Sequence, residues 1–209
     1  MALATAEVRA ARRRLRELRL GLDPRARAAA QRAIRSRLEQ LGIFRRGARV
    51  ALYLPMPGEV DLRPSFDDAA GRGVLLYVPR ITSHRGRRMV FAPWTRGAPQ
   101  RRNTLGIAEP SSMAGRRPAV GIDVVVLPVV GFDRRGNRLG MGAGYYDRAL
   151  RRRQDAARAW RRPLLVGVAF ACQELPAIPA SPWDVPLDLI VTERGIIAPV
   201  RAATAEDDG

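Results

Sequence analysis

The stretch from Val124 to Leu150 constrains the fold more than any other part of the chain. It begins with a β-branched run that Pro128 ends, and it closes with a helical pattern that starts at Tyr145. Between the two lies a loop whose glycines stand at positions 131, 136, 140, 142 and 144. Because glycine accepts positive φ and lets the backbone approach an anion closely, this order of strand, loop and helix predicts a phosphate-binding loop.

Arg138 adds to this loop a planar guanidinium, which matches the geometry of phosphate oxygens. Two commoner nucleotide motifs are excluded. A Walker A loop needs Gly-Lys-Ser/Thr, and the chain contains no lysine, while Gly144 comes one residue too early for a dinucleotide fingerprint. The glycines alone leave open an ordinary surface turn, but the arginine, the paired tyrosines and the aspartate of this stretch favour a binding loop.

The length of 209 residues suits one domain, which we expect to span residues 1–200, with a disordered acidic tail at 201–209. The single cysteine, Cys172, excludes a disulfide framework, and no Cys/His cluster is present for zinc. Every apolar run is of strand length and is broken by proline or a charge. We therefore expect a cytoplasmic, monomeric protein without a membrane partner.

The formal net charge of +17 would suit a nucleic-acid partner. All 37 basic residues are arginine, however, and they are scattered over every segment, a bias that we attribute to coding composition. Aromatic residues make up only 6% of the chain, which is few for a surface that stacks on bases. We expect no specific nucleic-acid partner, and a polyanionic small ligand fits the charge equally well.

Two helices are predicted at the N-terminus. Apolar residues at helical spacing indicate that the first helix packs one stripe on the domain while its arginines, Arg19 among them, stay in solvent. The stripe consists of Val8, Ala11, Leu15, Leu18 and Leu22. Asp23 and Pro24 predict the N-cap and first residue of a second helix, which runs through Ile34 and Leu38 and ends at Gly42.

Short apolar runs, several of them closed by proline, predict the strands, which we place at 50–54, 73–78, 89–92, 124–127, 164–170, 188–192 and 196–198. His84 falls in the turn before the third strand and is expected to be a solvated turn residue. Residues 94–121 predict a long loop, residues 145–160 a helix, and residues 175–186 a rigid proline-rich loop. The alternation of helices and strands predicts a three-layer α/β/α domain with a mainly parallel sheet and a helical N-terminus.

Two acidic residues follow the first predicted strand, at the sheet edge where α/β proteins bind ligands. Asp61 is a natural N-cap for a short helix that ends near Ala70, so we interpret it as structural. Glu59 suits either a hydrogen bond to a ligand or turn chemistry. The residues alone leave these two roles of Glu59 open.

The sequence resembles the 5-formyltetrahydrofolate cyclo-ligase family, also called methenyltetrahydrofolate synthetases, over nearly its whole length up to Thr192. The most specific part of the resemblance is Pro128-x-x-Gly-Phe-Asp-x-x-Gly-x-Arg-Leu-Gly-x-Gly-x-Gly-Tyr-Tyr-Asp147. Three weaker blocks lie in the family's order, at 55–61, 106–110 and 175–192.

The resemblance implies an ATP- and Mg²⁺-dependent conversion of 5-formyltetrahydrofolate to 5,10-methenyltetrahydrofolate, with release of ADP and phosphate. The formyl oxygen would attack the γ-phosphate, and N10 would then close the ring. By the same resemblance Arg138 and Tyr145 are catalytic, and Asp147 and Asp184 bind the metal. Substrate binding is implied for Leu54, Glu59, Met141 and Tyr145. ATP binding is implied for Arg9, Arg12, Arg138, Leu139, Gly140, Met141, Gly142, Ala143, Gly144, Tyr145 and Tyr146.

Some of these positions have another reading from the residues alone. Asp147 suits the first turn of a helix, where an acid is favoured, and Tyr146 could belong to the core. The N-terminal helix departs from the family's Lys-x-x-Leu-Arg: Arg12 matches the arginine, but Val8 stands at the lysine position. Arg9 is the candidate substitute, but arginine does not replace lysine neutrally, which puts ATP affinity or register at this end in question. The apolar stripe places Val8 toward the domain, so this helix could also serve packing alone.

Two rival functions remain at this point: an RNA-binding or regulatory protein that keeps the fold, and another ATP-dependent small-molecule ligase. An RNA-binding protein would have no need of the two carboxylates that the resemblance assigns to magnesium. The presence of these carboxylates, together with Arg138 and the glycines at 140, 142 and 144, therefore favours an ATP-dependent enzyme.

Overall fold

Seven strands form one sheet, in the order β11-β10-β9-β6-β1-β2-β3. The computed structural model describes residues 5–104, 106–151 and 163–199, so the expected tail at 201–209 and the end of the helix predicted for 145–160 lie outside it. The sheet strands are β1 (Arg49–Ala51), β2 (Leu75–Ser83), β3 (Arg88–Pro93), β6 (Val124–Pro128), β9 (Leu164–Val168), β10 (Leu189–Val191) and β11 (Ile196–Ile197). The helices are α1 (Thr5–Leu20), α2 (Pro24–Gln40), α3 (Arg63–Gly71) and α4 (Tyr145–Leu150), with 3₁₀ turns η1 (Ala119–Gly121) and η4 (Ala171–Gln173).

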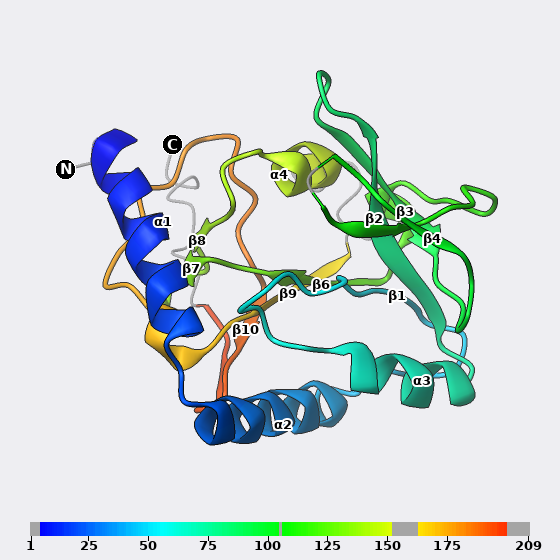
Figure 1. The fold of residues 1–209 in the computed structure, drawn as a ribbon, viewed down its shortest axis with the longest axis horizontal. Helices are drawn as coiled ribbons and strands as arrows, with labels where there is room; N and C mark the ends of the chain where they lie inside the picture. The colour runs from blue at the N-terminus through cyan, green and yellow to red at the C-terminus, as the bar shows by residue number, and fades with distance from the viewer. Residues whose placement is uncertain (1–4, 105, 152–162, 200–209) are drawn as a thin grey trace, which may run out of the picture.

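The sheet is parallel from β10 to β2 and has an antiparallel strand at each edge. Helices α2 and α3 cover one face, and α4 lies on the other (Figure 1). Both faces are buried, by one apolar cluster that includes Ile34, Leu38 and Phe66 and a second that includes Leu127 and Leu150. The prediction of an α/β fold with a mainly parallel sheet is confirmed.

The strand order reverses between β1 and β6, which are neighbours in the sheet. The chain leaves β1 towards α3 on one face, whereas α4 lies in the connection from β6 to β9 on the opposite face (Figure 1). The loops that follow β1 and β6 therefore part from each other at the carboxyl edge of the sheet. This is the topological switch point, the position at which open α/β sheets commonly bind their ligands.

The second predicted helix is confirmed in detail. Asp23 is the N-cap of α2, and its Oδ1 accepts hydrogen bonds from the backbone N–H groups of Arg25 at 2.9 Å and Ala26 at 3.0 Å. Pro24 opens the helix, where its missing N–H has no intrahelical partner to lose. None of the described helices is long and apolar enough to cross a membrane.

The apolar stripe predicted for α1 is wrong in its last turn. Leu15 is buried against Val130, Leu139 and Ile178, as expected of the stripe. Leu18, however, is 43% exposed, while Arg19, which we expected in solvent, is only 3% exposed. Residues three and four apart both lie near one another on a helix, so the spacing allows either Leu18 or Arg19 to follow Leu15, and the structure buries Arg19.

Three predicted strand and loop boundaries also need correction. Strand β1 ends at Ala51, earlier than predicted, because its ladders with β2 and β6 stop there. Strand β2 continues through Pro79, although proline has no N–H group to donate to a neighbouring strand. On one side β1 has already ended. On the other side Pro79 lies opposite Phe91, whose N–H donates to the Arg117 carbonyl and not to β2. The segment predicted as a long loop contains an antiparallel pair, β4 (Gln100–Arg102) with β5 (Ala108–Pro110).

Candidate nucleotide and substrate site

The glycine-rich loop is built around the buried carboxylate of Asp133, which has no exposed surface. Its Oδ1 accepts hydrogen bonds from the backbone N–H groups of Arg135 at 2.9 Å and Asn137 at 3.0 Å. Its Oδ2 accepts from the Asn137 side chain at 2.9 Å and from the Ile178 N–H at 2.9 Å. Asp133 thus closes the turn between β7 (Gly131–Phe132) and β8 (Arg138–Leu139) and attaches it to the loop after β9.

Of the three glycines at positions 140, 142 and 144, two have the positive φ that we expected of this loop. Gly142 and Gly144 have φ values of 94° and 68°, which a residue with a side chain adopts only with strain, whereas Gly140 has no positive φ. Gly144 is also the N-cap of α4. The backbone at 142–144 is therefore held in a path that depends on glycine.

Helix α1 contacts this loop through two arginines. The Nε atom of Arg12 donates to the Gly140 carbonyl at 2.9 Å, and an Nη atom of Arg16 lies 3.0 Å from the Met141 sulfur. Burial and the neighbouring Arg16 lower the pKa of the Arg12 guanidinium, while the charge of Asp184 raises it. Arg12 was predicted at this site. Arg16 was missed, although its spacing of four from Arg12 places it on the same face of the helix.

Arg9, the other predicted arginine of this helix, has an exposed side chain. Within the part of the chain that the structure describes, it makes no hydrogen bond or ion pair with the glycine loop. The structure therefore brings Arg12, but not Arg9, to the loop.

Arg138 joins three segments of the site. Its side chain, only 6% exposed, forms an ion pair with Asp147 of α4 and donates a hydrogen bond to the backbone carbonyl of Val185. Val185 follows Asp184, whose Oδ2 accepts from the Ser181 N–H at 2.8 Å. The two predicted metal ligands therefore belong to segments that Arg138 holds together. Among the described residues, no group of three His, Cys, Asp or Glu side chains is placed to hold a metal.

The two tyrosines that begin α4 face different surroundings. Tyr146 packs against the core, and its pKa is raised by burial and then by the charge of Glu59, while Arg138 acts in the opposite direction. The charges of both Glu59 and Arg138 therefore reach this side chain. The hydroxyl of Tyr145 lies 3.1 Å from Nδ1 of His84.

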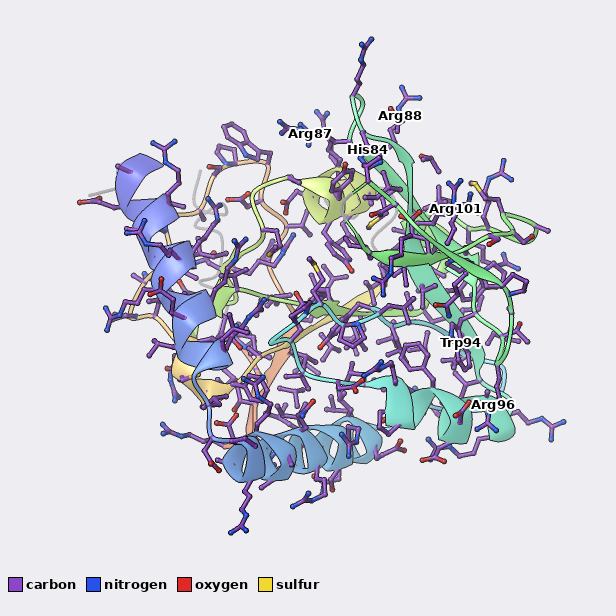
Figure 2. The ribbon with its side chains drawn as sticks, viewed as in Figure 1. His84, Arg87, Arg88, Trp94, Arg96 and Arg101 are labelled. Atoms are coloured by element: carbon purple, nitrogen blue, oxygen red, sulfur yellow. The ribbon has the colours of Figure 1, made fainter. Side chains whose placement is uncertain are left out.

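His84 is exposed, as predicted, but it is more than a solvated turn residue. Its Nε2 atom lies 3.1 Å from the Thr104 hydroxyl, while Nδ1 contacts Tyr145. Figure 2 shows His84 on the β2–β3 hairpin beside α4. The side chain thus links the hairpin, the β4–β5 pair and the start of α4, and no sequence pattern indicated this.

A second part of the site lies after β1, where the chain forms an open cleft of about 500 Å³. Glu59 lines this cleft, and a neighbouring hollow of about 190 Å³ includes Leu54. Both predicted substrate residues from this loop are thus at a cavity surface. The main cleft is bounded by Leu20, Arg27, Pro55, Met56, Pro57, Gly58, Glu59, Asp61, Arg63 and Arg102.

Glu59 is held in place within the cleft wall. Its side chain is 5% exposed, and its Oε2 accepts a hydrogen bond from the Met56 N–H at 3.0 Å. Burial raises the pKa of Glu59, while the Met56 hydrogen bond and the charges of Arg19 and Arg16 oppose that rise. Asp61, interpreted as structural, accepts a hydrogen bond from the Arg63 N–H at 3.0 Å, although Leu62 rather than Asp61 is the N-cap of α3.

Comparison with known proteins identifies the family. The family model described as "5-formyltetrahydrofolate cyclo-ligase family" matches residues 4–193. The chain belongs to this family. The cyclo-ligase of Haemophilus influenzae is 29% identical over 182 residues, which cover 86% of this chain and 95% of that protein. The Escherichia coli K12 cyclo-ligase is 33% identical over 144 residues, which cover 68% of this chain and 76% of that protein.

Solved structures of the family share the fold of this cyclo-ligase family member. The NMR structure of Aquifex aeolicus 5,10-methenyltetrahydrofolate synthetase matches with a TM-score of 0.77 at 29% identity and covers 96% of each chain. The synthetase of Mycoplasma pneumoniae matches with a TM-score of 0.69 at 24% identity, over 89% of this chain and 98% of that one.

Proposed function

We propose that this family member converts 5-formyltetrahydrofolate to 5,10-methenyltetrahydrofolate, with ATP cleaved to ADP and phosphate. The observation that carries the proposal is the junction at Arg138, which joins the glycine loop, α4 and the Asp184 loop. This junction and the Glu59 cleft follow neighbouring strands of the sheet at its switch point. One site can therefore hold a triphosphate and a folate together.

The nucleotide part of the proposal assigns the triphosphate to the loop from Leu139 to Tyr146, with Arg12 and Arg138 as its cations. The positive φ values at Gly142 and Gly144 support this, because such a path exposes backbone N–H groups to an anion. Arg9, being exposed, would meet only the outer end of the nucleotide. Arg16 is the further arginine that contacts this loop.

Mg²⁺ is proposed to enter with ATP, held by Asp147 and Asp184. Magnesium in proteins commonly takes one or two carboxylates and completes its shell with phosphate oxygens and waters. Two carboxylates on segments joined by Arg138 fit that need, and a larger cluster of protein ligands is not required. The bound ion would supply charge neutralisation between the phosphates.

The folate part of the proposal assigns the pterin ring to Leu54, Glu59, Met141 and Tyr145. The Glu59 carboxylate would accept hydrogen bonds from pterin N–H groups, a role supported by its place in the cleft wall.

In the proposed reaction the formyl oxygen attacks the γ-phosphorus and ADP leaves. N10 then adds to the activated formyl carbon, and the oxygen departs as part of inorganic phosphate. No enzyme side chain forms a covalent bond. The guanidinium groups of Arg138 and Arg12 hold the phosphates and stabilise the negative charge that shifts during transfer, which is where most catalysis of phosphoryl transfer arises.

The proposal includes the setting of the enzyme: a cytoplasmic monomer whose partners are 5-formyltetrahydrofolate and ATP. The scatter of its arginines over all segments supports a protein without a nucleic-acid partner.

A filter-binding measurement with RNA at two salt concentrations tests the expected absence of a specific nucleic-acid partner. Weak binding that collapses as salt rises is expected, since nonspecific contacts to phosphates are salt-dependent.

The proposed reaction is tested by incubating the protein with 5-formyltetrahydrofolate, ATP and Mg²⁺ and following the absorbance of the methenyl product. Turnover is expected only when all three are present, with ADP formed in equal amount. A folded sample that produces no methenyl absorbance would contradict the proposal. ATP cleavage without product would point to another ATP-dependent ligase.

Replacing Arg102 with alanine should raise KM for the folate about fivefold and leave kcat unchanged. A charge that binds the tail of the substrate stabilises the bound substrate and the transition state equally, so its loss weakens binding without slowing the chemical step. Arg102, Arg27 and Arg63 line the cleft, and the glutamate tail of the folate carries carboxylates. Arg101→Ala is the matched control, since adjacent residues of a strand face opposite sides. Equal effects of the two variants would contradict the assignment.

A further inference from the structure

Arg19 is a buried cation to which the proposed nucleotide site assigns no role. It lies in the last turn of α1, where its side chain is 4% exposed and faces Glu59, which is 5% exposed. The Nη2 atom of Arg19 lies 3.8 Å from Oε1 of Glu59. Within the described residues, the Nε atom of Arg19 is buried and has no hydrogen-bond partner.

This burial has a cost that packing does not explain. A guanidinium removed from water is destabilising unless its charge and its donors are satisfied, and an apolar side chain at such a position is often neutral or stabilising. One turn earlier on the same face, α1 places Leu15, which fills its apolar surroundings. An arginine at position 19 therefore points to a role beyond stability.

The geometry around Glu59 indicates that role. Met56 holds Oε2 through its N–H, which leaves Oε1 on the side of Arg19. A separation of 3.8 Å gives Coulomb attraction but is too long for a hydrogen bond, so Arg19 stabilises the carboxylate without occupying its acceptor. Among the described residues no donor bonds to Oε1, and this oxygen stays available to a ligand.

The other groups around Glu59 do not supply the same stabilisation. Arg16 acts on Glu59 in the same direction as Arg19 but more weakly, and its own Nη atom is directed to Met141. Burial raises the pKa of Tyr53 and of Tyr146, which keeps both hydroxyls neutral. Arg27 donates to the backbone carbonyl of Arg19, and so supports its position.

We propose that Arg19 is a positioning residue for folate binding, which fixes the charge and orientation of Glu59 so that Oε1 can accept a hydrogen bond from the pterin. This rests on the proposed function, in which Glu59 binds the folate. Arg19 itself does not line the cleft, and it acts through Glu59. Gly58 covers it, since a Cβ at Gly58 would lie 3.4 Å from the Arg19 Nε.

The test compares Arg19→Leu, Arg19→Lys and Glu59→Gln by equilibrium titration with 5-formyltetrahydrofolate and, separately, with a non-hydrolysable ATP analogue. Arg19→Leu should weaken folate binding about tenfold and change binding of the ATP analogue by less than about twofold. Arg19→Lys, which retains the charge, should recover part of the loss. Arg13→Leu removes an exposed charge from the same helix and is the matched control, expected to change neither affinity.

Two readouts separate positioning from a merely structural role. In the Glu59→Gln background, Arg19→Leu should weaken folate binding by less than about twofold further, because residues that act as one unit are not additive. In Arg19→Leu alone, Glu59 would take up a proton at a higher pH than in the native protein. Folate affinity, which needs the carboxylate, should therefore be lost at a higher pH as the solution is acidified.

The outcomes also separate failure of this inference from failure of the proposed function. If Glu59→Gln leaves folate binding intact, the proposed role of Glu59 is wrong. If Glu59→Gln weakens binding but Arg19→Leu does not, the inference about Arg19 is overturned. It is also overturned if Arg19→Leu lowers the unfolding temperature and both affinities together, since that would mark Arg19 as structural.

Discussion

Replacing Arg138 with alanine should lower kcat/KM about a thousandfold, as expected for a donor that stabilises developing charge on a transferred phosphoryl group. The side chain is almost fully buried and lies where the glycine loop, α4 and the Asp184 loop meet. Its loss would remove the proposed phosphate contact and also deprive Asp147 of its ion-pair partner. A variant whose kcat/KM stays within about tenfold of the native value would exclude Arg138 from the chemistry.

The same substitution should also reduce stability, by about 2 kcal/mol, because the partly buried Asp147 and the Val185 carbonyl lose their donor. Kinetics and denaturant unfolding on one preparation separate the two effects. Arg134→Ala is the matched control: Arg134 lies on the same loop and pairs with Glu174, but its side chain is 72% exposed. That variant should keep native activity and nearly native stability.

Asp133→Ala should cause the largest loss of stability, about 4 kcal/mol, because four N–H donors around a fully buried carboxylate would lose their acceptor. Asp133→Asn should lose less. The amide oxygen can still accept from the backbone at 135 and 137, but its NH₂ group would face other donors. Urea unfolding measures both variants, and KM for ATP should rise in each as the glycine loop loses its shape.

Asp67→Ala provides the comparison for this prediction. Asp67 also pairs with an arginine, Arg96, but both side chains lie at the surface, so removing the pair should leave the unfolding midpoint nearly unchanged. Equal effects of Asp67→Ala and Asp133→Ala would show that the buried network does not hold the loop.

Much of the fold could be predicted because it depends on local patterns. The Asp23–Pro24 cap of α2 and the apolar strands of the parallel sheet are readable from neighbouring residues. The burial of Arg19 is not readable in this way. A helical period gives the spacing of a stripe, but which side of it meets the rest of the protein depends on segments that are distant in the sequence.

The same distinction applies to the candidate site. The positions of Arg138 and the glycines could be predicted because the loop that contains them is continuous in sequence, and the position of Glu59 because parallel strands end at one edge of the sheet, while their roles in binding stay predictions. The contact of His84 could not be predicted, whereas the spacing of Arg16 from Arg12 indicates only that the two side chains share a face of the helix. His84 meets Tyr145 across 61 positions of the chain, and no local pattern encodes such a pair.

The packing of α1 has a consequence for the order in which the molecule forms and opens. Arg12 contacts Gly140 across 128 positions, and the helix rests on a small apolar cluster of its own, apart from the two that bury the sheet. Contacts of such long range carry a large loop-closure cost, so we expect them to form late in folding, and we expect a helix on a separate small cluster to detach without unfolding the sheet. A nucleotide held between α1 and the glycine loop would oppose that detachment, and so would fasten the N-terminal helix to the protein.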